Sequence, residues 1–442
     1  MKKTLFFAIA AAGMLAACSN NDSLDATNNG ISELSQEKIQ LGVSTTASVS
    51  TRGTGTVGGL KDEDNVWAGQ DLWIYMLKKD SMEVQQYVDP NGNGTDIFNN
   101  TKFIAPKGQA GESYGIASTA NGFVGYYPVN GQSDFWGYRV DDAVTLSGNN
   151  APAVKMLTAE GTETDNATEA TQRVVDVTIN GTQDIMAGKA ELEDGDAEKL
   201  GAGERANDYY SAFAARKGVQ PNINFKHLLT RFTFNVKAGN KSAAGNGDNT
   251  GAVTVTGLSV GSRTNGQLIV AHTGEIADTS LLTFKDPTMT QLVLCERQGD
   301  DHNTPLVAIS KDNNNTVPLT WNNDNDWADT ISIGEALLVA PGETVYPLTI
   351  NLKQSVVTNV TDAENPNKED KVLQYKAFLK LNNNAKFEMG KSYDVTITIY
   401  GLEKIVVTAT LNPWLDGGKI DIDDDKDPES TFTEPSEPGE IL

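Results

Sequence analysis

The chain has 442 residues and a formal net charge of −24 at pH 7, with 59 Asp and Glu against 35 Lys and Arg. This excess of negative charge disfavours nucleic acid and anionic membrane surfaces as partners. The length allows about two to three domains, and 41 Gly with many Asn, Asp and Thr indicate turns rather than long helices.

The first eighteen residues have the pattern of a lipoprotein signal peptide. Lys2 and Lys3 precede an apolar run over residues 5–15, which is too short to span a bilayer as a stable helix. Small residues stand directly before Cys18 and polar residues follow it. We therefore expect residues 1–17 to be a signal peptide, cleavage between Ala17 and Cys18, and acylation of Cys18, including palmitate. An ordinary signal peptide with an incidental cysteine is the alternative.

The expected destination is the outer membrane of a Gram-negative cell, because Ser19 follows the cysteine and no basic retention sequence is present. Once Cys18 is acylated, Cys295 is the only other thiol, so an internal disulfide is not expected. Residues 19 to about 36 are polar and rich in Asn, which predicts a flexible spacer.

From residue 39 the polarity alternates with period two, as in a strand with one buried face. The apolar positions are Ile39, Leu41, Val43, Ala47 and Val49. The glycine-rich residues 51–59 that follow predict exposed chain. Arg52 lies in this stretch, where a trypsin-like protease could reach it, although it could also be an ordinary surface arginine.

Short runs with strand propensity continue at the spacing of an all-β protein. The first set is 72–77, 123–129, 135–140, 174–179, 223–236, 253–260 and 267–271, and the second is 292–296, 336–340, 346–352, 373–381, 393–400 and 405–411. The predicted fold is all-β, with two tandem β-sandwich domains over residues 53–272 and 273–416 and minor helical insertions, one of them within 196–217. Residues 417–442 are acidic and contain prolines, which predicts a disordered tail.

Residues suited to catalysis or metal binding are sparse. The three histidines, His227, His272 and His302, show no metal-ligand spacing. Ser259 stands in a nucleophile-elbow pattern, but inside a β run with no helix after it, so a hydrolase is disfavoured. Residues 89–94 resemble the start of a calcium loop, yet the twelfth position is Asn100, and a turn is expected. We expect no catalytic residue, no metal and no cofactor.

Several segments, in this order, resemble the fimbrillin family. They are the residues around Cys18, the strand end at 48–52, the segment 224–236, the segment 387–397, and Pro413-Trp414. The family comprises subunits of type V pili in anaerobic Gram-negative bacteria. The resemblance implies two transthyretin-like β-sandwiches, export as a lipoprotein, and an arginine-specific protease that removes the first strand. A strand from another pilus subunit then fills the groove.

On this sequence the cut falls between Arg52 and Gly53, so that residues 18–52 leave as a lipidated propeptide and residues 53–442 reach the fimbrium. Losing the apolar strand residues would cost ~1–3 kcal/mol for each larger side chain, which is comparable in sum with a domain's stability of about 5–15 kcal/mol. The candidate donor strand is the tail, with Ile420, Ile422 and Phe432 as anchors. Its acidic run and prolines make it a poor copy of the first strand, so a tip or accessory position competes with a stalk position.

A rival interpretation is a permanently anchored outer-membrane lipoprotein that binds glycans. In that case Trp136, Trp321 and Trp327 would be exposed stacking platforms. The expected partners of the pilus subunit are other pilus subunits, an arginine-specific protease, the lipid anchor before maturation, and a host or bacterial surface ligand.

Overall fold

The computed structural model describes residues 37–45, 66–89, 91–110, 115–147, 150–201, 210–247, 251–297, 306–310, 316–322, 327–359, 367–381, 384–402, 405–412 and 431–433. These residues are mostly β, with two short helices, α1 (Asp196–Leu200) and α2 (Ala212–Arg216). The predicted all-β class is therefore confirmed. Within the described ranges no helix is long and apolar enough to cross a membrane.

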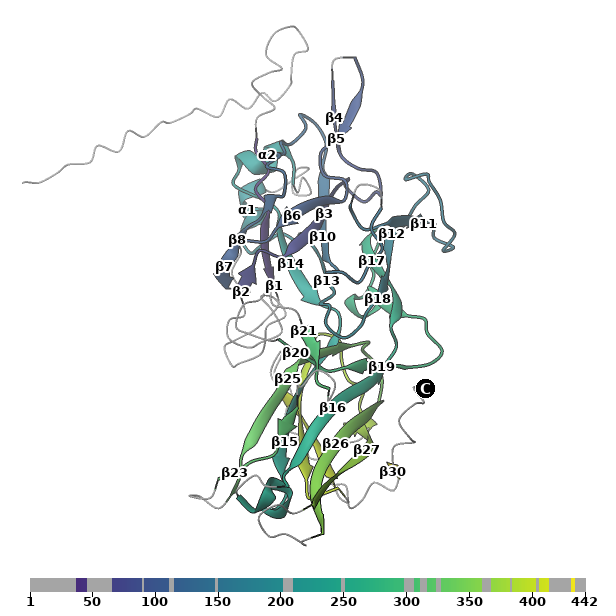
Figure 1. Ribbon diagram of the computed structural model, residues 1–442. Helices are drawn as coiled ribbons and strands as arrows, with labels where there is room; N and C mark the ends of the chain where they lie inside the picture. Colours follow the sequence, from purple (N-terminus) through teal and green to yellow (C-terminus); the bar gives the residue numbers. More distant parts are fainter. Residues whose placement is uncertain are drawn as a thin grey trace, which may run out of the picture.

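The upper half of the molecule in Figure 1 holds an eight-stranded and a four-stranded sheet, which we call the upper sandwich. The larger sheet has the order β8 (Gly115–Ile116), β1 (Gly42–Thr45), β14 (Asn222–His227), β13 (Met186–Lys189), β10 (Ser133–Arg139), β3 (Asp71–Lys78), β6 (Thr101–Ile104), β9 (Ser118–Thr119). The smaller sheet has the order β11 (Val154–Leu157), β12 (Gln172–Thr178), β17 (Asn265–His272), β18 (Leu282–Phe284).

The lower half holds a second pair of sheets, the lower sandwich. One sheet has the order β25 (Thr330–Val339), β15 (Thr230–Ala238), β28 (Ser392–Ile399), β29 (Ile405–Asn412). The other has β19 (Thr290–Val293), β16 (Val253–Ser262), β26 (Val345–Asn359), β27 (Asn367–Lys380), β30 (Thr431–Thr433), with β22 (Val317–Pro318) also on β16. Two sandwiches in tandem are thus present as predicted.

Smaller elements complete the described chain. Four two-stranded pairs are β2 (Val66–Ala68) with β7 (Lys107–Ala110), β4 (Gln86–Val88) with β5 (Gly94–Asp96), β20 (Cys295–Arg297) with β21 (Leu306–Ala308), and β23 (Trp321–Asn322) with β24 (Trp327–Ala328). Two 3-10 turns are η1 (Ser242–Gly247) and η2 (Asp278–Ser280).

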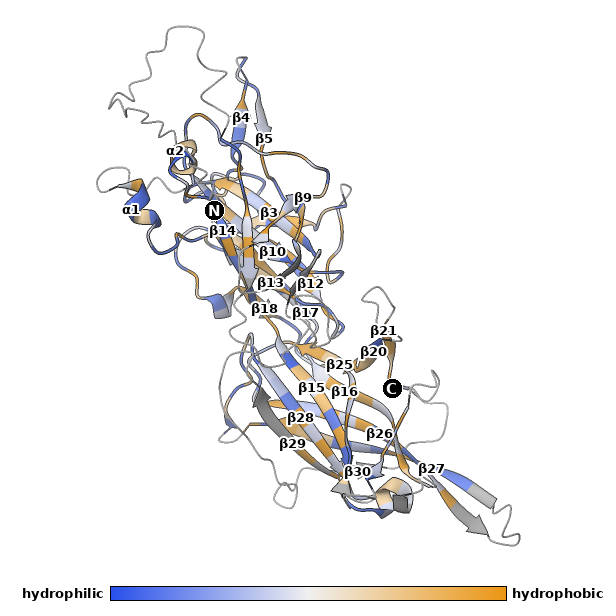
Figure 2. Ribbon diagram, turned by 90° about the vertical axis from the view of Figure 1, so that its left-hand side faces the viewer, coloured by the Kyte–Doolittle hydropathy of each residue, from blue (hydrophilic) through white to orange (hydrophobic). Residues whose placement is uncertain are grey.

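The packing explains the residue patterns of the strands. From Phe232 to the end of β15, apolar residues that are buried alternate with polar residues that are half-buried, and Figure 2 shows this alternation of hydropathy. Phe232 of β15 packs edge-on against Tyr346 and Phe387, with ring centroids 5.4 and 5.2 Å apart, at the centre of the lower sandwich. By contrast β3 is a continuous apolar run and is buried on both faces, because both sides of its sheet are covered.

The chain passes between the two sandwiches more than once. β15 and β16 pair with lower strands, β17 and β18 return to the upper sandwich, and β19 pairs with β16 again. Hydrogen bonding between strands is therefore not divided at residue 272, and the domain boundary placed there remains a prediction.

Three of the strand predictions differ from the structure. The run 292–296 is divided between β19 and β20, which lie in different sheets. The run 223–236 is two strands in different sheets, β14 and β15, separated by the fully buried Leu228 and Leu229. The run 123–129 is not a strand and forms a single bridge, between Tyr126 and Lys38. In the run 123–129 Tyr127 is buried, but Phe123, Val124, Tyr126 and Val129 are exposed, so most of its apolar side chains have no neighbouring sheet face against which to pack.

Candidate functional site

Residues 37–45 lie in the interior of the larger sheet of the upper sandwich, and Gly42–Thr45 among them form the strand β1 (Figure 1). On one side, β1 pairs in parallel with β14, with Gly42 opposite Asn222 and Val43 opposite Ile223. On the other side, Val43 lies opposite Gly115 of β8 in an antiparallel pair. Neighbours hydrogen-bond this segment from both sides, although it lies close to the start of the chain.

Backbone hydrogen bonds extend this pairing beyond β1. The amide of Ala117 donates to the carbonyl of Leu41, and that of Ile39 donates to the carbonyl of Gly125, both at 3.0 Å. The amide of Tyr127 donates to the carbonyl of Glu37, also at 3.0 Å. Residues 115–117 and 125–127 therefore form one continuous flank along the segment, and we call residues 115–129 the flanking segment.

The apolar side chains of the first strand that the structure describes are all buried. Ile39 is 7% exposed, Leu41 2% and Val43 0%, and they share one core cluster with Ile223 and Phe225 of β14. Burying three such side chains contributes about 5–9 kcal/mol, which is comparable with the whole stability of a domain. Removal of residues 37–45 would open a long apolar slot between β14 and the flanking segment.

The polar positions of this strand agree only in part with the prediction of one buried face. Gln40 is exposed, as the alternation predicts. Ser44 is only 3% exposed, and its hydroxyl donates a 3.4 Å hydrogen bond to Oδ1 of Asn224. The single-face prediction is wrong at the Ser44 end because both sides of the sheet are covered there.

Several predicted site residues lie outside the described residues. They are the cleavage and acylation positions Ala17 and Cys18, the maturation site Arg52 and Gly53, the strand residues Ala47 and Val49, and the tail residues Ile420 and Ile422. Phe432, the remaining donor candidate, lies in β30, which pairs antiparallel with the edge of β27 and places Phe432 opposite Tyr375. That edge belongs to the lower sandwich.

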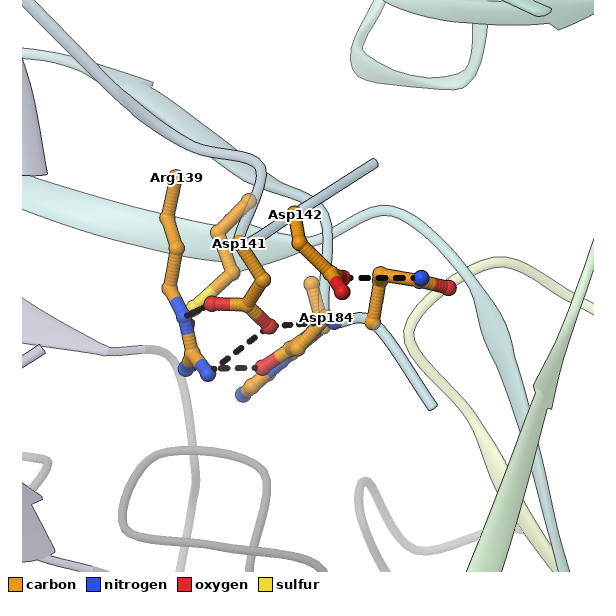
Figure 3. Close-up of polar contacts among 7 residues, drawn as sticks. Arg139, Asp141, Asp142 and Asp184 are labelled. Atoms are coloured by element: carbon orange, nitrogen blue, oxygen red, sulfur yellow. Dashed lines mark hydrogen bonds and ion pairs between the residues drawn. The ribbon is translucent and has the colours of Figure 1, made fainter. Parts of the chain in front are cut away.

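A buried ionic cluster, which the sequence analysis missed, lies where β10, β13 and β14 end (Figure 3). Arg139 Nε is 2.7 Å from Asp141 Oδ1, and Arg139 Nη1 is 3.3 Å from Asp184 Oδ2. Asp184 Oδ1 lies 3.0 Å from Nδ1 of His227. Burial lowers the pKa of Arg139, but Asp141 and Asp184 outweigh it and raise the pKa above the usual value.

This cluster has a structural role at the junction of the sandwiches. Its carboxylates fix the segment around Asp184, and the nearby carbonyl of Gly181 accepts a 2.8 Å hydrogen bond from the amide of Leu338 in β25. The only hint of this cluster in the sequence is that Asp141 and Asp142 closely follow Arg139. An exposed arginine can have acidic neighbours in the same way, so this hint does not indicate burial. The partner Asp184 lies 45 residues from Arg139.

The residues that were considered as candidates for catalysis or metal binding are dispersed over the described chain. Ser259 lies within β16, not at a strand-to-helix turn, and its hydroxyl donates a 2.9 Å hydrogen bond to Gln291. Asp89 accepts hydrogen bonds from the amides of Asn91 and Asn93 in the β4–β5 turn. Across the ranges that the structure describes, no group of three or more His, Cys, Asp or Glu could hold a metal ion.

A polar cleft of about 610 Å³ opens beside β10, β13 and β14. Trp136 lies in it but is only 5% exposed, because Lys189 Nζ lies 4.9 Å from its ring centroid and the His272 ring 4.6 Å. The expectation that Trp136 is an exposed stacking platform is therefore wrong. Trp321 is half-buried against the lower core, and Trp327 lies in β24.

The sequence matches the fimbrillin-like family over residues 51–414. No curated protein matches the chain. A fimbrial protein from Bacteroides vulgatus has a similar solved structure, with 16% identity over 85% of this chain and 99% of that chain and a TM-score of 0.40. The fimbrial anchor protein Mfa2 from Porphyromonas gingivalis has 10% identity over 86% and 99% of the two chains and a TM-score of 0.29.

The match to the family model identifies the family of this chain. It begins before β2 and ends just after β29, so it includes both sandwiches except for β1 and β30. The expectation that the resemblance raised is confirmed: the chain belongs to the fimbrillin-like family.

Proposed function

We propose that this protein is a cell-surface pilus subunit that is exported as a lipoprotein acylated at Cys18, cut between Arg52 and Gly53, and assembled by strand exchange. The observation that carries the proposal is the position of residues 37–45. They include the interior strand β1, carry three buried apolar side chains, and precede Arg52 in the chain. A cut at Arg52 therefore separates this strand covalently from the body that it completes.

The physical basis of strand exchange is that residues 37–45 and a strand from another copy compete for the same slot. After the cut, residues 37–45 are held only by noncovalent contacts with β14 and the flanking segment. A strand from another copy can make the same backbone hydrogen bonds, while its alternate side chains fill the places of Leu41 and Val43. Because the empty slot has unpaired backbone on both sides, occupancy by some strand is strongly favoured.

The tail is the proposed donor, with Ile420, Ile422 and Phe432 as anchors. Phe432 pairs with β27 here, so donation requires the tail to leave that edge. The acidic run at 421–429 and the prolines leave few apolar residues to fill the slot. A stalk position requires this tail to fill the slot of the next copy, whereas a tip or accessory position requires only that the slot accepts a strand.

The cut is tested with the purified precursor and an arginine-specific protease. We expect a fragment that begins at Gly53, followed by oligomers that resist dissociation in detergent. Arg52→Lys is the matched control, because it keeps the positive charge, resists this protease, and regains assembly when a lysine-specific protease cuts it instead. A mature fragment with another N-terminus, or normal assembly of uncut Arg52→Ala, would contradict the mechanism.

A further inference from the structure

An exposed apolar patch lies along the flanking segment. Its members are Ile116, Phe123, Val124, Tyr126 and Val129, with exposed fractions from 38% to 61%. We call these five residues the rim patch. They are half of the ten large apolar side chains that are exposed in the part of the chain that the structure describes. Such concentration of apolar surface typically marks an interaction site.

The rim patch is held in place by the core beneath it. The Phe123 ring packs edge-on against the buried Phe98, with 6.1 Å between ring centroids. The backbone of Tyr126 hydrogen-bonds the hydroxyl of Tyr87 through both its amide and its carbonyl. A side chain at Gly125 would overlap the Phe98 ring, so the backbone rests directly on that ring. The exposed side chains are therefore presented on a fixed surface.

The rim patch also borders the slot of the first strand. Ile116 lies opposite Gly42 in the β1–β8 pair, and Tyr126 forms a bridge with Lys38. On the opposite side of the slot the sheet continues through β14 and β13. On the side of the rim patch, β8 continues along the chain into β9, which pairs with β6, so the rim patch borders the slot on the side away from β14.

We propose that the rim patch is the docking surface for a second copy of this chain, the copy whose strand replaces residues 37–45. This inference rests on the proposed strand exchange. A donor strand is covalently attached to its own folded body, so that body must lie close to one end of the slot. The rim patch extends from Ile116 beside β1 to Tyr126 beside Lys38, and gives that body an apolar surface to cover.

The charge of the chain supports a contact of this kind. Two copies that each carry a net charge of −24 repel one another, and a contact through apolar side chains brings no like charges together. The backbone of the donor strand provides hydrogen bonds that any strand could make. The rim patch adds a contact with the folded domains of the subunit that donates the strand. This contact favours donor subunits that are copies of this protein.

The test compares two double variants of the full-length precursor, both cleaved at Arg52. Val124→Asp with Val129→Asp alters the rim patch, at side chains that are 38% and 40% exposed. Leu146→Asp with Val293→Asp adds the same charge at side chains that are 53% and 43% exposed elsewhere. Filling of the slot is measured separately, by binding of a synthetic peptide of residues 37–49 after the original strand has been removed.

We expect the rim variant to bind the peptide as the wild type does, but to form oligomers at least about tenfold more slowly. The control variant should assemble at the wild-type rate. If the rim variant assembles at the wild-type rate, the rim patch is not a docking surface, and the proposal of strand exchange is unaffected. Cleaved wild type that binds the peptide but stays monomeric would overturn both strand exchange between copies and the rim contact.

Discussion

The backbone amide of Ile39 donates a 3.0 Å hydrogen bond to the carbonyl oxygen of Gly125, and this bond joins the first strand to the segment that carries the rim patch. The strand that is proposed to leave and the surface that is proposed to receive a partner are therefore direct neighbours. Any strand that occupies the place of Ile39 must bond to this carbonyl or leave it unpaired, which costs about 1–3 kcal/mol in a buried position.

The stability of the precursor should depend on Leu41, whereas that of the mature protein should not. Leu41→Ala removes a side chain that is 2% exposed and should lower the free energy of unfolding of the precursor by about 2–5 kcal/mol. Denaturant unfolding before and after cleavage measures this. After the first strand has been cut and washed away, variant and wild type should unfold alike. Gln40→Ala, at an exposed position, is the control and should change neither form.

Gly125 should not tolerate a side chain. Gly125→Ala places a methyl group against the Phe98 ring and should destabilise the precursor by about 1–3 kcal/mol. The double variant Gly125→Ala with Phe98→Leu provides room for the methyl group, so part of the loss should be recovered. Thermal unfolding of the two variants and of Phe98→Leu alone measures this coupling. Strictly additive losses would show that the methyl group and the ring do not meet.

The buried first segment could be predicted in part from the sequence. Ile39, Leu41 and Val43 alternate with less apolar residues, as buried side chains of a strand do, and all three are buried, although only Val43 lies within β1. Its position inside the sheet could not be predicted, since its partners are Gly115, Gly125 and Asn222, far away along the chain. The alternation of apolar and polar residues predicts which side chains are buried, but it does not predict which strands lie next to them.

The opposite error occurred at 123–129. Phe123, Val124 and Tyr126 have strong strand propensity, and propensity cannot distinguish a buried strand from an exposed segment that contacts a neighbour through its backbone. The ionic cluster around Arg139 was missed for a related reason. A buried arginine is recognisable only by its carboxylate partners, and Asp184 is brought to it by the pairing of β10 with β13.

Removing a single carboxylate from the ionic cluster around Arg139 should lower the stability of the protein strongly. Asp184→Ala leaves the buried Arg139 without one of its two carboxylates and should cost about 3–5 kcal/mol of stability. Asp142→Ala, at an exposed carboxylate that accepts a 2.9 Å hydrogen bond from Gln183, should cost about 1 kcal/mol. Adding Arg139→Met to Asp184→Ala should cost less than the sum of the single changes. Equal losses at Asp184 and Asp142 would contradict the structural role of the cluster.

Asp286 should make stability depend on pH in the acid range. Backbone amides of Asn265 and Thr264 and their side chains donate to its carboxylate and lower its pKa from 3.8 to about 2. Since the pKa is lower in the folded protein, the stabilisation is complete above pH 3.8 and is lost as the pH falls towards 2. Asp286→Asn should therefore be less stable than the wild type at pH 7, and the difference should shrink below pH 3.8. A constant difference across this range would exclude the ionised carboxylate as the cause.

The role of the tail can be separated from that of the slot by truncation. A chain that ends at residue 412 keeps β29 but loses Ile420, Ile422 and Phe432. If the tail donates the strand, the cleaved truncated protein should still bind the peptide of residues 37–49 but should not polymerise alone. Added to cleaved wild type, it should occupy a growing end and shorten the oligomers in proportion to its concentration. Chain length measured by sedimentation reports this effect, and unaided polymerisation of the truncated protein would place the donor strand elsewhere in the chain.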